Sequence, residues 1–138
     1  MDAAAIIRSL EIAAARGGDL TDAVYARLFA EHPDMEALFV RDTSGAVKAE
    51  MLAKVFEMIL DLVDRGVYAG HLVQCEVVTH DAYGVPPDVF PAFFDVVAEV
   101  LKHMAGAQWT PAMTDAWAEV LAKLRWYSTH PDQSATVG

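Results

Sequence analysis

Cysteine is nearly absent from this sequence, since Cys75 is the only one among 138 residues. One thiol cannot form an internal disulfide, and without a cysteine pair the chain lacks the usual thiolate ligands of zinc or an iron–sulfur cluster. Residues 1–5 lack the basic start of a secretory signal, and charges interrupt every apolar stretch before it reaches the roughly 20 residues of a membrane-spanning helix. We therefore expect a soluble, cytoplasmic protein with a structural thiol.

Positive charge is also scarce, because ten lysines and arginines face twenty acidic residues and give a formal net charge of −10. Nucleic acids and anionic membranes are bound mainly through basic patches, so we expect neither as a partner. Internal repeats and Gly/Ser linkers are missing too. This predicts one domain over residues 1–130, followed by a short polar, flexible tail at 131–138.

Strand-like alternation of apolar and polar residues does not extend over four positions anywhere, whereas apolar residues recur at helical spacing almost throughout. The sequence therefore predicts an all-α fold with six to seven helices of unequal length. The clearest has its apolar stripe between Ala46 and Arg65, with Met51, Leu52, Val55 and Ile59 among the inward positions. The other helices are expected over 2–16, 21–31, 33–39 (short), 69–81, 88–104 and from 110 onward.

Glycine and proline predict where these helices begin and end. Gly17-Gly18, Gly66 and Gly106 are expected to end helices. Pro86-Pro87-Asp88 marks the start of the helix over 88–104, and Thr110-Pro111 combines an N-cap with proline at the first helical position.

Motifs of self-sufficient enzymes are missing. The sequence contains no HExxH, no GxSxG elbow and no glycine-rich phosphate loop after a strand. No Glu-x-x-His pair occurs, which argues against a carboxylate di-iron bundle. Five histidines are present, at positions 32, 71, 80, 103 and 130, without the close pairing of a mononuclear metal site.

Four stretches in a fixed order nevertheless resemble one family. They are Val24–Phe29 (VYARLF), His32–Phe39 (HPDMEALF), His80–Pro87 (HDAYGVPP), and Trp109-Thr110-Pro111 together with Asp115-Ala116-Trp117. Their order and spacing resemble the globins, in particular single-domain bacterial globins similar to the haem domain of flavohaemoglobins. The resemblance covers about residues 2–128, and it implies a globin fold whose helices surround a haem pocket.

The resemblance also implies roles for individual residues. His80 would be the ligand of the iron of haem b, with Val85 following it in the haem wall, and Phe39 would pack against the ring. Tyr25 would donate a hydrogen bond to an oxygen or nitric oxide molecule on the other side. Outside the family context, His80 would be interpreted as a surface or capping histidine at a helix C-terminus, and Tyr25 and Phe39 as ordinary core aromatics.

The position opposite His80 aligns with Lys48, where the family usually has glutamine or histidine, and Leu52 fits its apolar contact one turn later. Three roles for Lys48 stay open: a solvated or propionate-paired cation, a donor to the gas, or a neutral amine that ligates iron. The first is the ordinary expectation, because desolvating an ammonium group is costly.

Two departures bear on function. Glu76 stands where the family generally has a leucine against the haem, and Phe90 stands where flavohaemoglobin-like members have a tyrosine near the proximal histidine. The second argues against strong peroxidase or nitric oxide dioxygenase chemistry, which would also need a separate reductase. We therefore expect a reversible gas binder, not an enzyme, with a homodimer left open. The alternative is a globin-fold regulatory or interaction protein without haem, for which Glu76 and Lys48 provide the argument.

Overall fold

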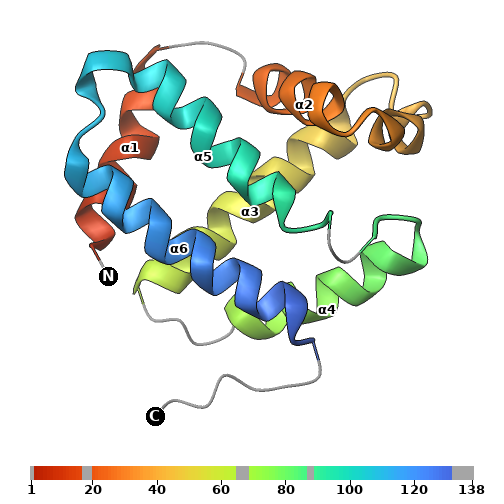
Figure 1. Ribbon diagram of the computed structural model, residues 1–138. Coiled ribbons are helices and arrows are strands. Elements are labelled where there is room, and N and C mark those ends of the chain that lie inside the picture. The colour runs from red at the N-terminus through yellow and green to blue at the C-terminus, as the bar shows by residue number, and fades with distance from the viewer. Residues whose placement is uncertain (1, 17–19, 65–68, 87–88, 132–138) are drawn as a thin grey trace.

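The computed structural model describes residues 2–16, 20–64, 69–86 and 89–131. Over these ranges the chain forms helices and turns and no strand, which confirms the all-α class. The elements, labelled in Figure 1, are α1 (Ala3–Arg16), α2 (Leu20–Glu31), the 3-10 helix η1 (Pro33–Phe39), α3 (Ala46–Asp64), α4 (Ala69–Ala82), α5 (Ala92–Ala105), the short 3-10 helix η2 (Gly106–Gln108) and α6 (Pro111–Thr129). None of the helices in these ranges is both long enough and apolar enough to cross a lipid bilayer.

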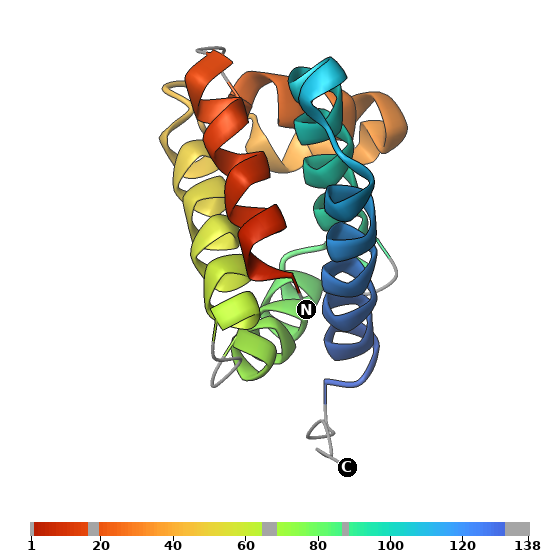
Figure 2. The ribbon, with the colours of Figure 1, turned by 90° about the vertical axis from the view of Figure 1, so that its left-hand side faces the viewer.

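The helices cross one another rather than forming a parallel bundle. Helix α1 contacts α5 and α6 on one side and α3 on the other, while α2 contacts α5 and η1. Helix α4 lies against α6 and the end of α3, so it closes the opposite end of the molecule from α2 (Figures 1 and 2). This arrangement leaves α4 and η1 facing each other across the space between α3 and α5.

The main core lies where α1, α3, α5 and α6 meet. Ile6, Ile59, Leu101 and Val120 have no exposed surface. Two buried polar groups connect α1 to α6, because the Trp117 indole N–H donates to the Ser9 hydroxyl over 3.0 Å and that hydroxyl donates to the Ile6 carbonyl. Over the described residues, no buried side-chain nitrogen or oxygen lacks a hydrogen-bond partner. This part of the molecule is therefore closed and fully satisfied.

Several helix ends follow the sequence rules. The Thr110 hydroxyl accepts from the Met113 N–H over 3.2 Å, and Pro111 occupies the first turn, as predicted for the start of α6. Gly106 ends α5 with φ of +54°, a conformation that only glycine adopts without strain. Asp42 precedes α3 and caps its first turn, because its carboxylate accepts from the N–H groups of Val47 and Lys48 over 3.1 and 3.0 Å.

The start of α5 differs from the expectation. Regular helix was predicted from residue 88, but α5 begins at Ala92, after a turn that includes Phe90. Pro91 has no backbone N–H, so a hydrogen-bond ladder that began before it would be interrupted there. Several of the predicted boundaries lie outside the described residues. These are the helix breaks at Gly17-Gly18 and Gly66, the helix start at Pro87-Asp88, and residues 132–138 of the expected tail, all of which remain predictions.

Gly70 brings α4 into close contact with α6. A methyl group added at this position would lie 2.2 Å from Cζ of Tyr127, far closer than two carbon atoms can approach. The Gln74 amide also donates to the His130 carbonyl over 2.8 Å, one turn further along α4. The first turns of α4 are therefore held directly against the end of α6.

Candidate functional site

A cavity of about 250 Å³ opens between η1, α3, α4 and the start of α5. Its wall is mostly apolar and contains five aromatic rings, from Tyr25, Phe39, Phe90, Phe93 and Phe94. Besides Tyr25, four titratable side chains line it: Lys54, Glu57, Glu76 and His80. An apolar cavity with a few convergent polar groups is the usual form of a small-molecule or cofactor site.

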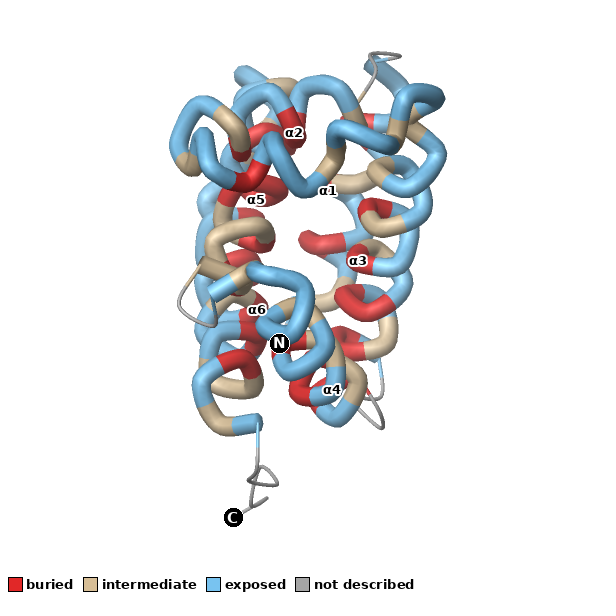
Figure 3. Tube along the Cα trace, turned by 90° about the vertical axis from the view of Figure 1, so that its right-hand side faces the viewer, coloured by how far each residue is buried: buried red, intermediate tan, exposed pale blue. Residues whose placement is uncertain are grey.

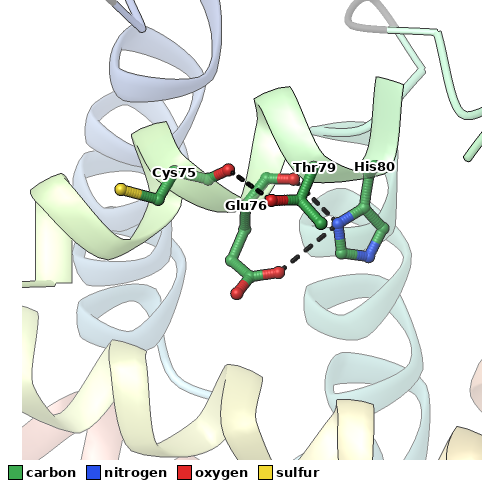
Figure 4. Close-up of polar contacts among 4 residues, drawn as sticks. All are labelled: Cys75, Glu76, Thr79 and His80. Atoms are coloured by element: carbon green, nitrogen blue, oxygen red, sulfur yellow. Dashed lines mark hydrogen bonds and ion pairs between the residues drawn. The ribbon is translucent and has the colours of Figure 1, made fainter. Parts of the chain in front are cut away.

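His80 lies in the last turn of α4, and its ring orientation is set by its own helix. Nδ1 lies 2.8 Å from the Glu76 carbonyl, which can only accept, so the proton must be on Nδ1 (Figure 4). In the neutral ring this leaves the Nε2 lone pair free, and over the described residues Nε2 has no hydrogen-bond partner. The Phe90 ring supports the imidazole, with 5.0 Å between centroids.

The Glu76 carboxylate lies on the same helix face as His80, one turn earlier. Its Oε2 is 3.5 Å from Nδ1, and both side chains are part of the cavity wall. Figure 4 shows Cys75 and Thr79 on another face of the helix, where the Thr79 hydroxyl donates to the Cys75 carbonyl over 3.1 Å. Cys75 is exposed and does not contribute to the cavity wall.

Tyr25 lies across the cavity from α4, on α2. Its ring is 2 % exposed, and its hydroxyl donates to the Lys48 carbonyl over a long distance of 3.3 Å. Burial, with a smaller contribution from the charge of Asp42, raises the pKa of the Tyr25 phenol above its ordinary value. The phenol therefore stays protonated and remains a hydrogen-bond donor at neutral pH.

Lys48 lies beside this tyrosine rather than in the cavity wall. Its Nζ is 5.6 to 6.0 Å from the ring centroids of Phe29, Phe39 and Tyr25, a cation–π arrangement. Desolvation acts to raise the pKa of the Asp42 carboxyl, but hydrogen bonds from the backbone N–H groups of Lys48, Val47 and Ala46, together with the Lys48 charge, lower it overall. The described cavity wall contains Lys54 instead, which pairs at 3.7 Å with Glu50.

The remaining site residues suggested by the sequence fall into two groups. Phe39 and Val85 line the cavity together with Tyr25 and His80. Leu52 is 4 % exposed and belongs to the main core, while its neighbours Met51 and Val55 line the cavity. The structure thus brings four of the six residues to one cavity, with Lys48 adjacent to it.

Sequence reasoning missed the charged residues of α3. Lys54 and Glu57 are not among the site residues expected from the sequence, yet both contribute to the cavity wall. The spacing of Met51, Val55 and Met58 was the available signal, because positions three and four apart share one helix face and Lys54 lies next to that face.

The donor set limits which metal groups the cavity can hold. No group of three or more His, Cys, Asp or Glu side chains that could enclose a metal ion occurs in the part of the chain that the structure describes. A single free imidazole nitrogen beside aromatic rings fits a metal that arrives with most of its ligands already supplied by a flat organic macrocycle.

Comparison with known proteins agrees with this geometry. The family model described as Globin matches residues 22–125, well over half of the chain. Searches among curated proteins and among solved structures give no significant match. The matched region includes every residue of the cavity wall.

Proposed function

The chain belongs to the globin family, and on that premise we propose that it holds one haem b in the cavity beside His80 and reversibly binds a diatomic gas. Globins as a family bind haem, whose iron supplies the binding site for oxygen or nitric oxide. One observation carries the proposal for this chain: the proton on Nδ1 of His80 is held by the Glu76 carbonyl, so Nε2 presents a free lone pair at an apolar cavity.

The other residues of the cavity have roles that follow from their positions. The Nε2 atom of His80 would bind the iron, and the rings of Phe39 and Phe90 would contact the faces of the macrocycle. Haem carries two carboxylate side arms, for which Lys54 supplies a positive charge at the wall. Tyr25 is the buried donor on the side opposite α4, and a small rotation of its hydroxyl would redirect it from the Lys48 carbonyl to a gas molecule.

The finer assignment rests on the sequence resemblance. Single-domain bacterial globins similar to flavohaemoglobin haem domains are the group that the four motifs resemble. On this proposal the protein binds gas without catalysing its conversion, and a nitric oxide dioxygenase activity would need a separate reductase. Phe90, which has no hydroxyl to bond near His80, supports the non-enzymatic role.

A second candidate is a globin-fold regulatory protein without haem. The observation that favours it is the presence of Lys54, Glu57 and Glu76 in the wall of an otherwise apolar cavity. A bound macrocycle would remove water from these side chains. Any charge that was buried in this way without an opposite charge or hydrogen-bond partner would oppose binding. The two candidates differ in one measurable property, which is haem uptake.

The test is a titration of the purified protein with haem, in which the Soret absorbance measures how much haem is bound. The parent chain is expected to take up one equivalent, and His80→Ala to lose stable uptake while its far-UV circular dichroism stays the same. His71→Ala is the matched control, because His71 lies on the same helix but is exposed and outside the described cavity wall. It is expected to behave like the parent.

Two results would contradict the proposal. If the parent fails to bind haem, the regulatory candidate replaces it. If His80→Ala binds haem as tightly as His71→Ala and the parent do, the chain is a haem protein whose iron is ligated elsewhere.

A further inference from the structure

We propose that Glu76 is a positioning residue that polarises His80 and thereby lowers the reduction potential of the bound iron. This inference rests on the proposed function, because it concerns a haem held by His80. It gives a role to the Glu76 carboxylate, a charged group in a cavity wall that is mostly apolar.

The geometry places two acceptors around one proton. Nδ1 of His80 lies 2.8 Å from the Glu76 carbonyl and 3.5 Å from Oε2 of the same residue (Figure 4). Residues four apart lie on the same face of a helix, so the carboxylate reaches the imidazole without distortion of α4. The carbonyl fixes the ring, and the carboxylate adds a negative charge next to the N–H.

Haem in the cavity would strengthen this contact. The Glu76 and His80 side chains are 40 % and 26 % exposed, and both form part of the cavity wall. A flat apolar ligand against them displaces water, and the interaction between a charge and an N–H dipole grows as the local dielectric constant falls. Glu76 therefore acts most strongly in the loaded protein.

The electronic consequence has a definite direction. A carboxylate that pulls on the Nδ1 proton raises the basicity of the imidazole, so Nε2 donates more electron density to the metal. Ferric iron carries one more positive charge than ferrous iron and gains more from this donation. Glu76 thus favours the ferric form, and its removal shifts the equilibrium toward the ferrous form.

Glu57 provides the matched control. It is an acidic residue of the same cavity wall, but it lies on α3, and no contact with His80 is present among the described residues. Glu57→Gln removes the same charge from the same cavity without touching the imidazole. A general effect of charge on the haem would appear in both variants, whereas polarisation of His80 would appear only in Glu76→Gln.

The experiment compares the haem-loaded parent, Glu76→Gln, Glu76→Asp and Glu57→Gln by spectroelectrochemical titration. At a fixed electrode potential, Glu76→Gln should raise the ferrous-to-ferric ratio about tenfold, which is about 59 mV for one electron. Glu57→Gln should change the ratio much less, and Glu76→Asp, which keeps the charge, should fall between the parent and Glu76→Gln. In the ferrous proteins, the iron–histidine stretching frequency should decrease in Glu76→Gln only.

The outcomes separate this inference from the proposed function. Normal haem uptake with equal potentials and equal stretching frequencies in Glu76→Gln and Glu57→Gln would overturn the role of Glu76 and leave haem binding intact. Failure of the parent to take up haem would overturn the proposed function, and this inference with it. If Glu76→Gln folds poorly, Glu76→Ala replaces it in the same comparison, and equality of Glu76→Ala with Glu57→Gln would overturn the role as well.

Discussion

The two halves of this molecule differ in how completely their own side chains fill the interior. Where α1, α5 and α6 meet, Ile6, Val97 and Leu101 have no exposed surface. Around the cavity, by contrast, the wall includes the partly exposed His80 and Phe90. Figure 3 shows the buried stretches of α3 and α5, in red, turned toward the middle of the molecule. We therefore expect the first half to contribute more to stability, whereas the second has the space and the imidazole nitrogen that a ligand needs.

The largest expected effect is in the closed half. Leu101→Ala removes a fully buried side chain from the main core, so it should lower the free energy of unfolding by about 2–5 kcal/mol. Leu60→Ala, at an exposed position on α3, is the control and should change it by about 0.5 kcal/mol or less. Denaturant unfolding of the protein without haem measures both. Equal effects would show that the core does not carry the stability.

A smaller effect in the same half comes from one hydrogen bond. Ser9→Ala removes the acceptor of the buried Trp117 N–H, and an unsatisfied buried donor costs about 1–3 kcal/mol. Ser128 is an equally buried serine, but its hydroxyl only donates to the Leu124 carbonyl of its own helix. Ser128→Ala should therefore lower the free energy of unfolding by about 1 kcal/mol or less. The same denaturant titration tests both, and a larger loss in Ser128→Ala would contradict the comparison.

In the open half, Tyr25→Phe should change gas binding more than stability. Oxygen on a ferrous haem gains partial negative charge, so a phenolic donor slows its release, whereas carbon monoxide gains much less charge. Removing the hydroxyl should speed oxygen dissociation about tenfold, equivalent to about 1.4 kcal/mol. Stopped-flow rates for both gases provide the measurement.

The carbon monoxide rate is the internal control for this variant. If both gases leave faster by the same factor, the loss of the phenol has loosened the aromatic cluster around Tyr25. If neither rate changes, the hydroxyl stays on the Lys48 carbonyl and does not reach the ligand.

The smallest expected effect concerns Asp42, whose carboxylate caps the first turn of α3. Its pKa is lowered in the folded chain, so its contribution to stability is present above the unfolded value and is lost as pH falls through the folded value. Asp42→Ala should therefore lower Tm at neutral pH, and the difference from the parent should shrink below about pH 4. Thermal unfolding at several pH values measures this. Asp81→Ala, at an exposed position, is the control, and a pH-independent difference for Asp42→Ala would contradict the prediction.

Local sequence rules predicted most of the fold. The predicted start of the helix over 46–65 agrees with the observed Ala46, and the Thr110 cap is present as expected. These features depend on residues that are close in the sequence. A helix cap needs a side chain that accepts from a nearby N–H, and an amphipathic helix needs apolar residues at helical spacing. The start of α5 was predicted too early because two proline signals compete, and only the later one, at Pro91, determines the ladder.

The site was less accessible from sequence because it depends on how helices cross. The hydrogen bond from His80 to the Glu76 carbonyl joins residues one helical turn apart, so sequence spacing can predict it. Which lysine lines the cavity depends on how the helices pack. Lys48 and Lys54 lie on the same helix, six residues apart, which separates them by about 120° around the helix axis. Only the packing of α3 against its neighbours shows which of these two directions meets the cavity. The Lys48 amine extends over the aromatic rings, whereas Lys54 lines the cavity.

The close contact between Gly70 and the Tyr127 ring makes the position of α4 dependent on the size of the residue at position 70. His80 lies ten residues beyond Gly70, about 15 Å along the helix axis at 1.5 Å per residue. A larger residue at position 70 would require either the Tyr127 ring to move or this end of α4 to shift away from α6. In the second case the change in helix direction would extend to His80, so the size of a side chain outside the cavity wall would affect the position of the imidazole.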